Sequence, residues 1–124
     1  MANNKKRILH VDDEPDTLTV VKKILEDEGF EVVSVDSGRE TLKRVNINGF
    51  DLLILDIMMP DMDGWDVCEK IKADKNTEKI PIVFLTAKDD PVSKSMGSLA
   101  SMDYVTKPFD NKDLIQRVKR VISK

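Results

Sequence analysis

An unbroken apolar run that ends at a single acid, Leu52-Leu53-Ile54-Leu55-Asp56, constrains the fold more than any other stretch of the sequence. The run is entered from Gly49 and is followed by Pro60 and Gly64, which favour turns. Four consecutive aliphatic residues between turn residues are typical of a strand that is buried on both faces. In open parallel sheets ligands bind at the carboxyl ends of such strands, where Asp56 would lie. Because a buried carboxylate is costly without a cation or hydrogen-bond donors, Asp56 is the first candidate functional residue.

Strand-like and helix-like segments alternate along the rest of the chain. The helical segments show apolar residues at helical spacing and carry helix-end signals. Strands are predicted at residues 8–11, 31–35, 52–56, 80–85 and 102–105, each followed by a helix, over about 15–28, 37–45, 63–71, 90–99 and 110–122. This alternation predicts one α/β domain with a doubly wound, five-stranded parallel sheet and helices on both faces.

Helix ends can be assigned to particular residues. Pro15 suits the first turn of a helix and Gly29 suits its end. Ser37 and Glu40 have the spacing of a capping box, and Asp63 and Asp110 are predicted N-caps. The segment around 90–99 is rich in serine and contains proline and glycine, which makes it a poor helix former.

Size and charge exclude several classes of protein. The chain has 124 residues, enough for one domain, which we expect at 7–124 after an N-terminal tail at 1–6. The formal net charge of −3, without a basic block, argues against direct nucleic-acid binding. A single cysteine, Cys68, allows no internal disulfide and suits a reducing compartment. No apolar run approaches the roughly 20 residues that span a bilayer, so a cytoplasmic protein without membrane contact is expected.

Polar residues end four of the five predicted strands. They are Asp12-Asp13, Asp56, Thr86 and Lys107. The carboxyl ends of parallel strands share one edge of the sheet, so these residues should converge. Three neighbouring carboxylates repel one another, and an oxygen-only ligand set of this kind suits Mg²⁺. A structural zinc site is excluded, since the chain has one cysteine and one histidine.

A metal, a hydroxyl and an ammonium group together favour phosphoryl chemistry. The metal and Lys107 would neutralise phosphoryl oxygens, while Thr86 would hydrogen-bond one of them. Asp56 is the best candidate nucleophile because it stands alone at a central strand end. Asp12 and Asp13 form a pair suited to holding the metal.

Four motifs in this order resemble the receiver domain of two-component response regulators, a CheY-like family, over essentially the whole chain. The residues that carry the resemblance are Val11-Asp12-Asp13-Glu14, Asp56 with Met59-Pro60-Asp61-Met62-Asp63-Gly64, Thr86-Ala87, and Asp103-Tyr104-Val105-Thr106-Lys107-Pro108-Phe109. Each motif alone is moderately specific, and together at these spacings they are highly specific.

The resemblance implies a flavodoxin-like fold with strand order 2-1-3-4-5 and five helices, and it implies a role for each site residue. Asp56 matches the phosphoacceptor. Asp12, Asp13, Asp56 and the backbone carbonyl of Met58 match the Mg²⁺ ligands. Thr86 and Lys107 match the hydroxyl and ammonium that meet the phosphoryl group, and the bond from Lys107 to Pro108 is expected to be cis. Thr86 and Tyr104 match the pair of switch residues.

The resemblance also implies partners. A sensor histidine kinase, or a phosphotransfer protein of a phosphorelay, would supply the phosphoryl group. A surface at the fourth helix, fifth strand and fifth helix would switch and bind an output domain or partner protein. Asp103 and Arg117 match positions that form salt bridges across an active dimer in one subfamily, with Lys112, Asp113 and Lys119 nearby, so phosphorylation is expected to promote a homodimer.

Two competing functions use the same residues. A hydrolase with an aspartyl-phosphate intermediate would place a second acid two residues after the nucleophile, where this chain has Met58, and would need a cap domain. A pseudo-receiver would lack one of the acids or the lysine, and all are present. The receiver is therefore expected to be a signalling protein that catalyses only its own phosphorylation and dephosphorylation. Whether an output domain follows Lys124 stays open.

Other polar residues have plain structural interpretations. His10 is interpreted as a histidine packed in a strand rather than a phosphoryl carrier, and Cys68 as inert core. Asp61 and Asp63 are better explained by a turn and a cap than by a second metal site. Trp65 is interpreted as partly exposed packing.

Overall fold

The structure is a computed structural model of the chain, and it describes residues 5–47, 49–57, 59, 61–87 and 103–123. The described residues form five strands and four helices. The strands are β1 (Arg7–Val11), β2 (Glu31–Val35), β3 (Leu52–Asp56), β4 (Ile82–Ala87) and β5 (Asp103–Lys107). The helices are α1 (Pro15–Asp27), α2 (Gly38–Ile47), α3 (Gly64–Ala73) and α5 (Asn111–Ile122). The helix predicted over about 90–99 and most of the N-terminal tail lie outside the described residues.

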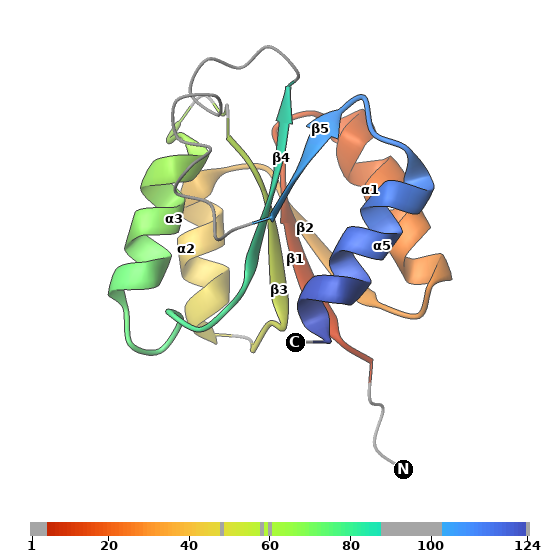
Figure 1. Cartoon of the computed structure of the whole chain (residues 1–124). Helices are drawn as coiled ribbons and strands as arrows, with labels where there is room; N and C mark the ends of the chain where they lie inside the picture. The colour runs from red at the N-terminus through yellow and green to blue at the C-terminus, as the bar shows by residue number, and fades with distance from the viewer. Residues whose placement is uncertain (1–4, 48, 58, 60, 88–102, 124) are drawn as a thin grey trace.

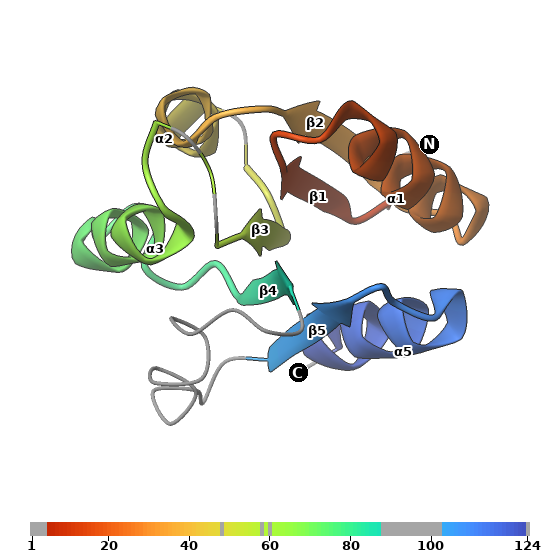
Figure 2. The same ribbon diagram turned by 90° about the horizontal axis from the view of Figure 1, so that it is seen from above.

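The strands form one parallel sheet with the order β2-β1-β3-β4-β5, which confirms the predicted fold and strand order. Helices α2 and α3 cover one face, and α1 and α5 cover the other (Figures 1 and 2). The arrowhead of β4 lies at the top of Figure 1, so the carboxyl edge of the sheet is at the top of that view. The start of β1 and the end of α5 lie at the opposite end.

Strand β3 lies at the centre of the sheet and is buried along its whole length. Leu53 and Leu55 join the apolar core beneath α2 and α3, while Leu52 and Ile54 join the core beneath α1 and α5. Side chains of a strand alternate between faces, so a strand covered on both faces needs apolar residues at every position. The burial of both faces of β3 therefore explains the unbroken apolar run. Asp56 lies at the carboxyl end of this buried strand.

The predicted helix ends are largely confirmed. Asp63 accepts a hydrogen bond from the Asp66 N–H at 3.0 Å, and Asp110 accepts one from the Lys112 N–H at 3.0 Å. Gly29 has a φ of 95°, the left-handed conformation that ends α1. Pro15 begins α1 as predicted.

Of the two hydrogen bonds predicted for the capping box at α2, one is present. The Glu40 N–H donates to Ser37 Oγ at 3.1 Å, but the Glu40 carboxylate accepts from Arg44 Nε at 3.1 Å, one helical turn further on. A salt bridge at this spacing competes for the carboxylate that a full box requires.

Three predicted strand boundaries were wrong by two residues. Strand β4 begins at Ile82 rather than Ile80 and continues to Ala87, and β5 continues to Lys107. Both strands end later than predicted because β4 and β5 pair beyond their apolar runs, with Thr86 opposite Thr106 and Ala87 opposite Lys107. The backbones of Thr86 and Lys107, both predicted site residues, thus belong to the paired strands of the sheet and not to a loop.

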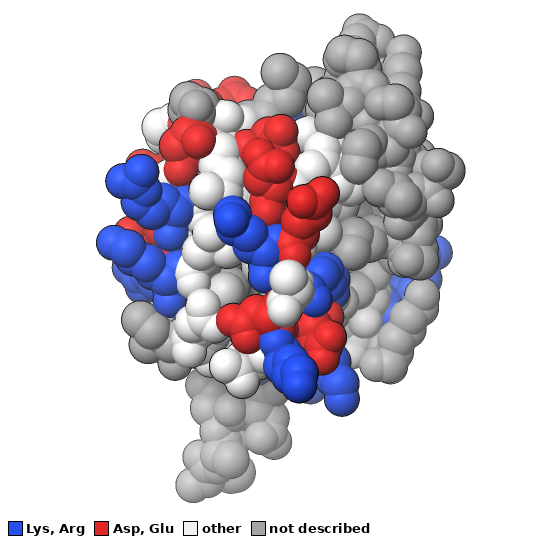
Figure 3. Space-filling model, turned by 90° about the vertical axis from the view of Figure 1, so that its left-hand side faces the viewer, with Lys and Arg blue, Asp and Glu red and all other residues white. Residues whose placement is uncertain are grey.

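Acidic and basic side chains are interspersed on the face that α2 and α3 present (Figure 3). Neither sign forms a continuous patch over these two helices. In the part of the chain that the structure describes, none of the helices combines the length and apolar character needed to cross a membrane.

Candidate functional site

Three carboxylates converge where β1 and β3 end. Asp12, Asp13 and Asp56 each offer an oxygen, and these oxygens lie within 4.8 Å of one another. Asp12 is fully buried and Asp56 is 5% exposed, whereas Asp13 faces solvent. The pairing of β1 with β3 produces this arrangement, because Val11 lies opposite Leu55 and each is followed directly by an acid, Asp12 or Asp56. The predicted convergence of these three residues is confirmed.

Lys107 enters the same cluster from β5. Its Nζ donates to Asp12 Oδ2 at 2.9 Å and lies 3.6 Å from Asp56 Oδ2. Burial acts to lower the pKa of Lys107, but the hydrogen bond to Asp12 and the charges of Asp56 and Asp12 outweigh it, so its pKa is raised. Lys107 therefore stays an ammonium ion at neutral pH and balances part of the negative charge.

The Asp12 carboxylate is held at both oxygens. Oδ2 accepts from Lys107, and Oδ1 accepts from the Glu14 N–H at 3.0 Å, at the turn between β1 and α1. The Glu14 carboxylate also accepts from Lys107 Nζ at 3.2 Å. The sequence analysis missed this role of Glu14. The only available signal was its place directly after the acidic pair.

The turn at residues 57–63 joins Asp56 to α3. The Gly64 N–H donates to the Ile57 carbonyl at 2.7 Å and closes the turn. A Cβ at Gly64 would lie 2.6 Å from the Asp56 carbonyl oxygen and 2.8 Å from the Ile57 Cα, so only glycine fits here. This close approach sets the backbone of Asp56 against the start of α3.

Two predicted site residues are placed by their backbone alone, and a third lies outside the described residues. The backbone of Thr86 lies in β4 opposite Thr106, and the backbone of Tyr104 lies in β5 opposite Phe84. The side chains of Thr86 and Tyr104 lie outside the description, as does the whole of Met58. The bond from Lys107 to Pro108 is cis, as predicted.

The chemistry of the cluster fits a hard divalent cation. Three carboxylates face one ammonium group, so their formal charges leave an excess of negative charge. Carboxylate oxygens close together, with one acid open to solvent, are the donors that Mg²⁺ prefers, since it keeps several water molecules. Asp12, Asp13 and Asp56 could therefore hold Mg²⁺.

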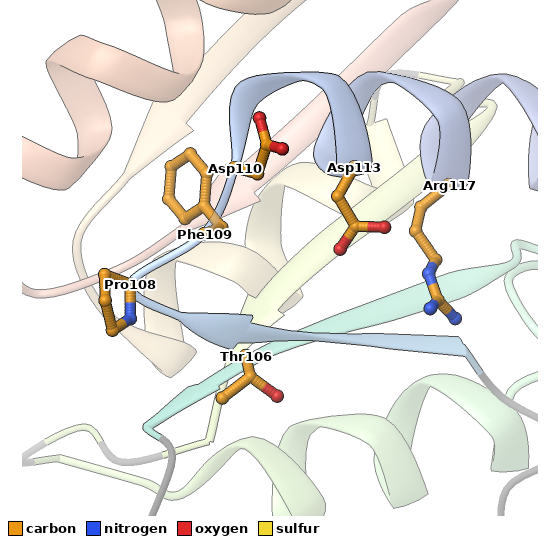
Figure 4. Close-up of a pocket in the computed structure, with 6 residues that line it drawn as sticks. All are labelled: Thr106, Pro108, Phe109, Asp110, Asp113 and Arg117. Atoms are coloured by element: carbon orange, nitrogen blue, oxygen red, sulfur yellow. The ribbon is translucent and has the colours of Figure 1, made fainter.

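Two hollows adjoin β5. A groove of about 330 Å³ runs beside Lys107 between α1 and the turn after β5, lined in part by Thr17, Val20 and Phe109. Val20 is 47% exposed, which is unusual for an aliphatic side chain. A second hollow of about 530 Å³ lies between β5 and α5 (Figure 4). Its lining residues are Thr106, Pro108, Phe109, Asp110, Asp113 and Arg117.

The plain interpretations of three other residues hold. His10 is fully buried in β1, and desolvation lowers its pKa to about 4, with Asp12 acting to raise it and Lys107 to lower it. Cys68 is buried in α3, and burial raises its pKa. Trp65 is partly buried and its ring centroid lies 4.5 Å from that of Phe84.

Comparison with known proteins identifies the family. The family model of the response regulator receiver domain matches residues 8–119. The chain belongs to the response regulator receiver domain family. It is 39% identical over 118 residues to the alkaline phosphatase synthesis transcriptional regulatory protein PhoP of Bacillus subtilis, covering 94% of this chain and 48% of that protein. It is 40% identical over 120 residues to the DNA-binding response regulator MtrA of Mycolicibacterium smegmatis, covering 96% and 51%.

This receiver spans about half the length of those two relatives. A solved structure with a similar fold is the receiver domain of sensor histidine kinase PA1611 from Pseudomonas aeruginosa PAO1, with a TM-score of 0.88 and 29% identity. The likeness covers 97% of this chain and 99% of that chain, which has a magnesium ion coordinated in its active site cleft. The chain is therefore a signalling domain of the two-component type and not a metabolic enzyme.

Proposed function

We propose that this receiver is a switch that accepts a phosphoryl group on Asp56 from the phosphohistidine of a sensor histidine kinase or a phosphotransfer protein. The observation that carries the proposal is the position of Asp56 at the end of the central strand, grouped with Asp12 and Asp13 and 3.6 Å from the Lys107 ammonium. Asp56 thus has a positive partner in Lys107 and lies beside Asp13, which is exposed to solvent.

The transfer is a displacement at phosphorus. An oxygen of Asp56 forms a bond to the phosphorus, the bond from phosphorus to the donor imidazole breaks, and the imidazole leaves with the electron pair. Lys107 balances charge on the phosphoryl oxygens, and the Thr86 hydroxyl donates to one of them. Asp12, Asp13, Asp56 and the Met58 carbonyl would hold Mg²⁺, which would supply further charge neutralisation when bound. Water later hydrolyses the acyl phosphate and restores Asp56.

The switch follows from the change in charge. Phosphorylation replaces a carboxylate by a dianionic acyl phosphate beside Lys107, which in the unmodified protein is shared among Asp12, Asp56 and Glu14. The new charge draws Lys107 and Thr86 toward it. Because these residues lie at the paired ends of β5 and β4, their movement biases the surface formed by β5, α5 and the predicted fourth helix, with Tyr104 as the second switch residue.

The output is an attached domain or a separate partner protein. The two relatives named above are transcriptional and DNA-binding regulators about twice as long as this chain, which supports a DNA-binding output domain. The receiver itself, which we place at 7–124 after a tail at 1–6, would contact neither nucleic acid nor membrane. It would act in the cytoplasm.

A phosphorylation-promoted homodimer is a second part of the proposal. Asp113 and Arg117 extend from α5 toward β5 beside the same hollow (Figure 4), on the surface predicted to switch. Lys119 is engaged within its own chain, where its Nζ lies 2.7 Å from Glu28 Oε1, so it is a weaker candidate for a contact between subunits. Sedimentation of the phosphorylated protein as a monomer at high micromolar concentration would exclude the dimer.

Nuclear magnetic resonance tests the switch separately from the chemistry. Addition of Mg²⁺ and beryllium fluoride, which mimics the phosphoryl group, should shift amide signals at Asp56 and along β4, β5 and α5. Signals of α2, on the opposite face, should move much less. Shifts confined to the residues around Asp56 would support phosphoryl binding and contradict the proposed output surface.

A further inference from the structure

The turn that follows Asp56 is fastened to a helix from elsewhere in the chain. Asp61 Oδ1 accepts from the Gly38 N–H and Oδ2 accepts from the Arg39 N–H, both at 3.1 Å. The partners lie 23 and 22 residues away in sequence. Gly38 and Arg39 begin α2, so one carboxylate caps the first turn of a helix to which it does not belong.

Asp61 completes the capping of α2. The first backbone N–H groups of a helix have no partner within the helix. In α2 the third of them, from Glu40, is satisfied by Ser37 Oγ at 3.1 Å, and the first two are satisfied by Asp61. Ser37 and Asp61 therefore perform the same task for α2, one from the preceding residue and one from the turn after Asp56.

The contact between this turn and α2 is also close in space. A Cβ at Gly38 would lie 3.0 Å from Met62 Cβ and 2.8 Å from Val67 Cγ2. The first residue of α2 thus packs directly on the turn and on α3. Helix α2 is itself fixed to the sheet, because Val45 lies in the same core as Leu53 and Leu55 of β3.

The turn that Asp61 attaches to α2 is also in contact with the backbone of Asp56, one of the three acids. Gly64 closes the turn through its bond to the Ile57 carbonyl and touches the Asp56 backbone. A turn released from α2 can shift as a unit, and a shift at Gly64 moves Asp56 relative to Asp12 and Asp13. Residues one step removed from metal ligands commonly affect affinity by orienting those ligands.

We infer that Asp61 is a positioning residue for the cation site: by tying the turn after Asp56 to the N-terminus of α2, it holds Asp56 in register with Asp12 and Asp13. The inference rests on the proposed function, since it assumes that these acids bind Mg²⁺. Asp61 is exposed at the surface and acts through the turn without touching the cation.

The experiment compares Asp61→Ala with Ser37→Ala, a matched control that removes a cap from the same helix without releasing the turn. Mg²⁺ alone is titrated into each variant by isothermal titration calorimetry, and urea unfolding measures stability. Asp61→Ala should raise the Kd for Mg²⁺ about ten-fold, the lower end of the effect of residues that support metal ligands. Ser37→Ala should lose similar stability but keep the wild-type Kd. Asp61→Asn, which retains one acceptor oxygen, should fall between Asp61→Ala and wild type.

Phosphorylation by acetyl phosphate gives a second readout. In Asp61→Ala the Mg²⁺ concentration for half-maximal rate should rise, while the rate at saturating Mg²⁺ stays near that of the wild type. Equal Kd values for wild type and Asp61→Ala would overturn the inference, as would an equal increase in Asp61→Ala and Ser37→Ala. A wild-type chain that binds no Mg²⁺ and accepts no phosphoryl group would instead overturn the proposed function, and with it this inference.

Discussion

Lys107 Nζ lies 2.9 Å from Asp12 Oδ2, although the two residues are 95 positions apart in sequence. One residue ends the edge strand β5 and the other follows the inner strand β1, and the Lys107 ammonium also lies 3.6 Å from Asp56 between them. The fully buried Asp12 thus has a positive partner before any metal arrives. The ion pair between Lys107 and Asp12 therefore joins β5 to the end of β1 at the site where we expect the phosphoryl group.

Lys107→Met should destabilise the metal-free protein by about 3 kcal/mol, because it leaves the buried Asp12 carboxylate without its counter-charge. Urea unfolding in chelator measures the loss, and Mg²⁺ should restore part of it by supplying a new positive partner. Lys119→Met is the matched control, since Lys119 pairs with Glu28 at the surface and should contribute below about 1 kcal/mol. Equal losses in the two variants would contradict the structural role of the Lys107 ion pairs.

Gly64→Ala should destabilise the protein on the order of 3 kcal/mol, because its Cβ would overlap the Asp56 carbonyl oxygen at 2.6 Å. The displaced backbone should also slow phosphorylation at Asp56. Gly49→Ala is the control, since no atom lies within 4 Å of a Cβ there, and its stability should change by less than about 0.5 kcal/mol. Thermal unfolding followed by circular dichroism measures both. A Gly64→Ala variant as stable as Gly49→Ala would show that the turn can move away from Asp56 at little cost.

His10 should make the fold sensitive to acid. The pKa of His10 is about 4 in the folded protein, against an ordinary value of 6.5. At a pH between 4 and 6.5, His10 is therefore protonated in the unfolded chain but largely neutral in the folded protein. The titration of His10 therefore does not change the free energy of unfolding above pH 6.5. As the pH falls from 6.5 to 4, it lowers the free energy of unfolding by about 3 kcal/mol in total.

His10→Leu isolates this effect from the titration of the carboxylates. Neither ring nitrogen of His10 has a hydrogen-bond partner among the described residues, so the substitution should cost little at pH 7. The free energy of unfolding in urea should then fall less between pH 7 and pH 4 for His10→Leu than for wild type. Parallel pH profiles would mean that His10 titrates in the folded protein as it does in the unfolded chain.

The sequence predicted those features that arise from local pattern. The run before Asp56 predicted the central strand, the strand ends predicted the convergence of Asp12, Asp13, Asp56 and Lys107, and single acids predicted the caps of α3 and α5. Each of these inferences needs only the periodicity of a strand or helix and the geometry of a parallel sheet.

Contacts that depend on how a turn packs against a different element were not predictable in this way. Asp61 was interpreted as a turn residue, and nothing near it in sequence indicates that its partners are Gly38 and Arg39. The bond from Lys107 to Glu14 likewise depends on where the end of β5 meets the turn before α1. The ends of β4 and β5 were predicted too early because a threonine, Thr86 or Thr106, follows each apolar run, and pairing between the two strands outweighs that local preference.

Phosphorylation of Asp56 is the central claim, and intact mass spectrometry tests it most directly. The protein is incubated with Mg²⁺ and acetyl phosphate beside an Asp56→Asn variant and a sample with chelator. The proposal predicts a gain of one phosphoryl group in the wild-type protein, and no gain in the variant or with chelator. A wild-type protein that gains no mass at any Mg²⁺ concentration, while circular dichroism shows an intact fold, would contradict the proposal and favour a receiver that binds its partners without phosphorylation.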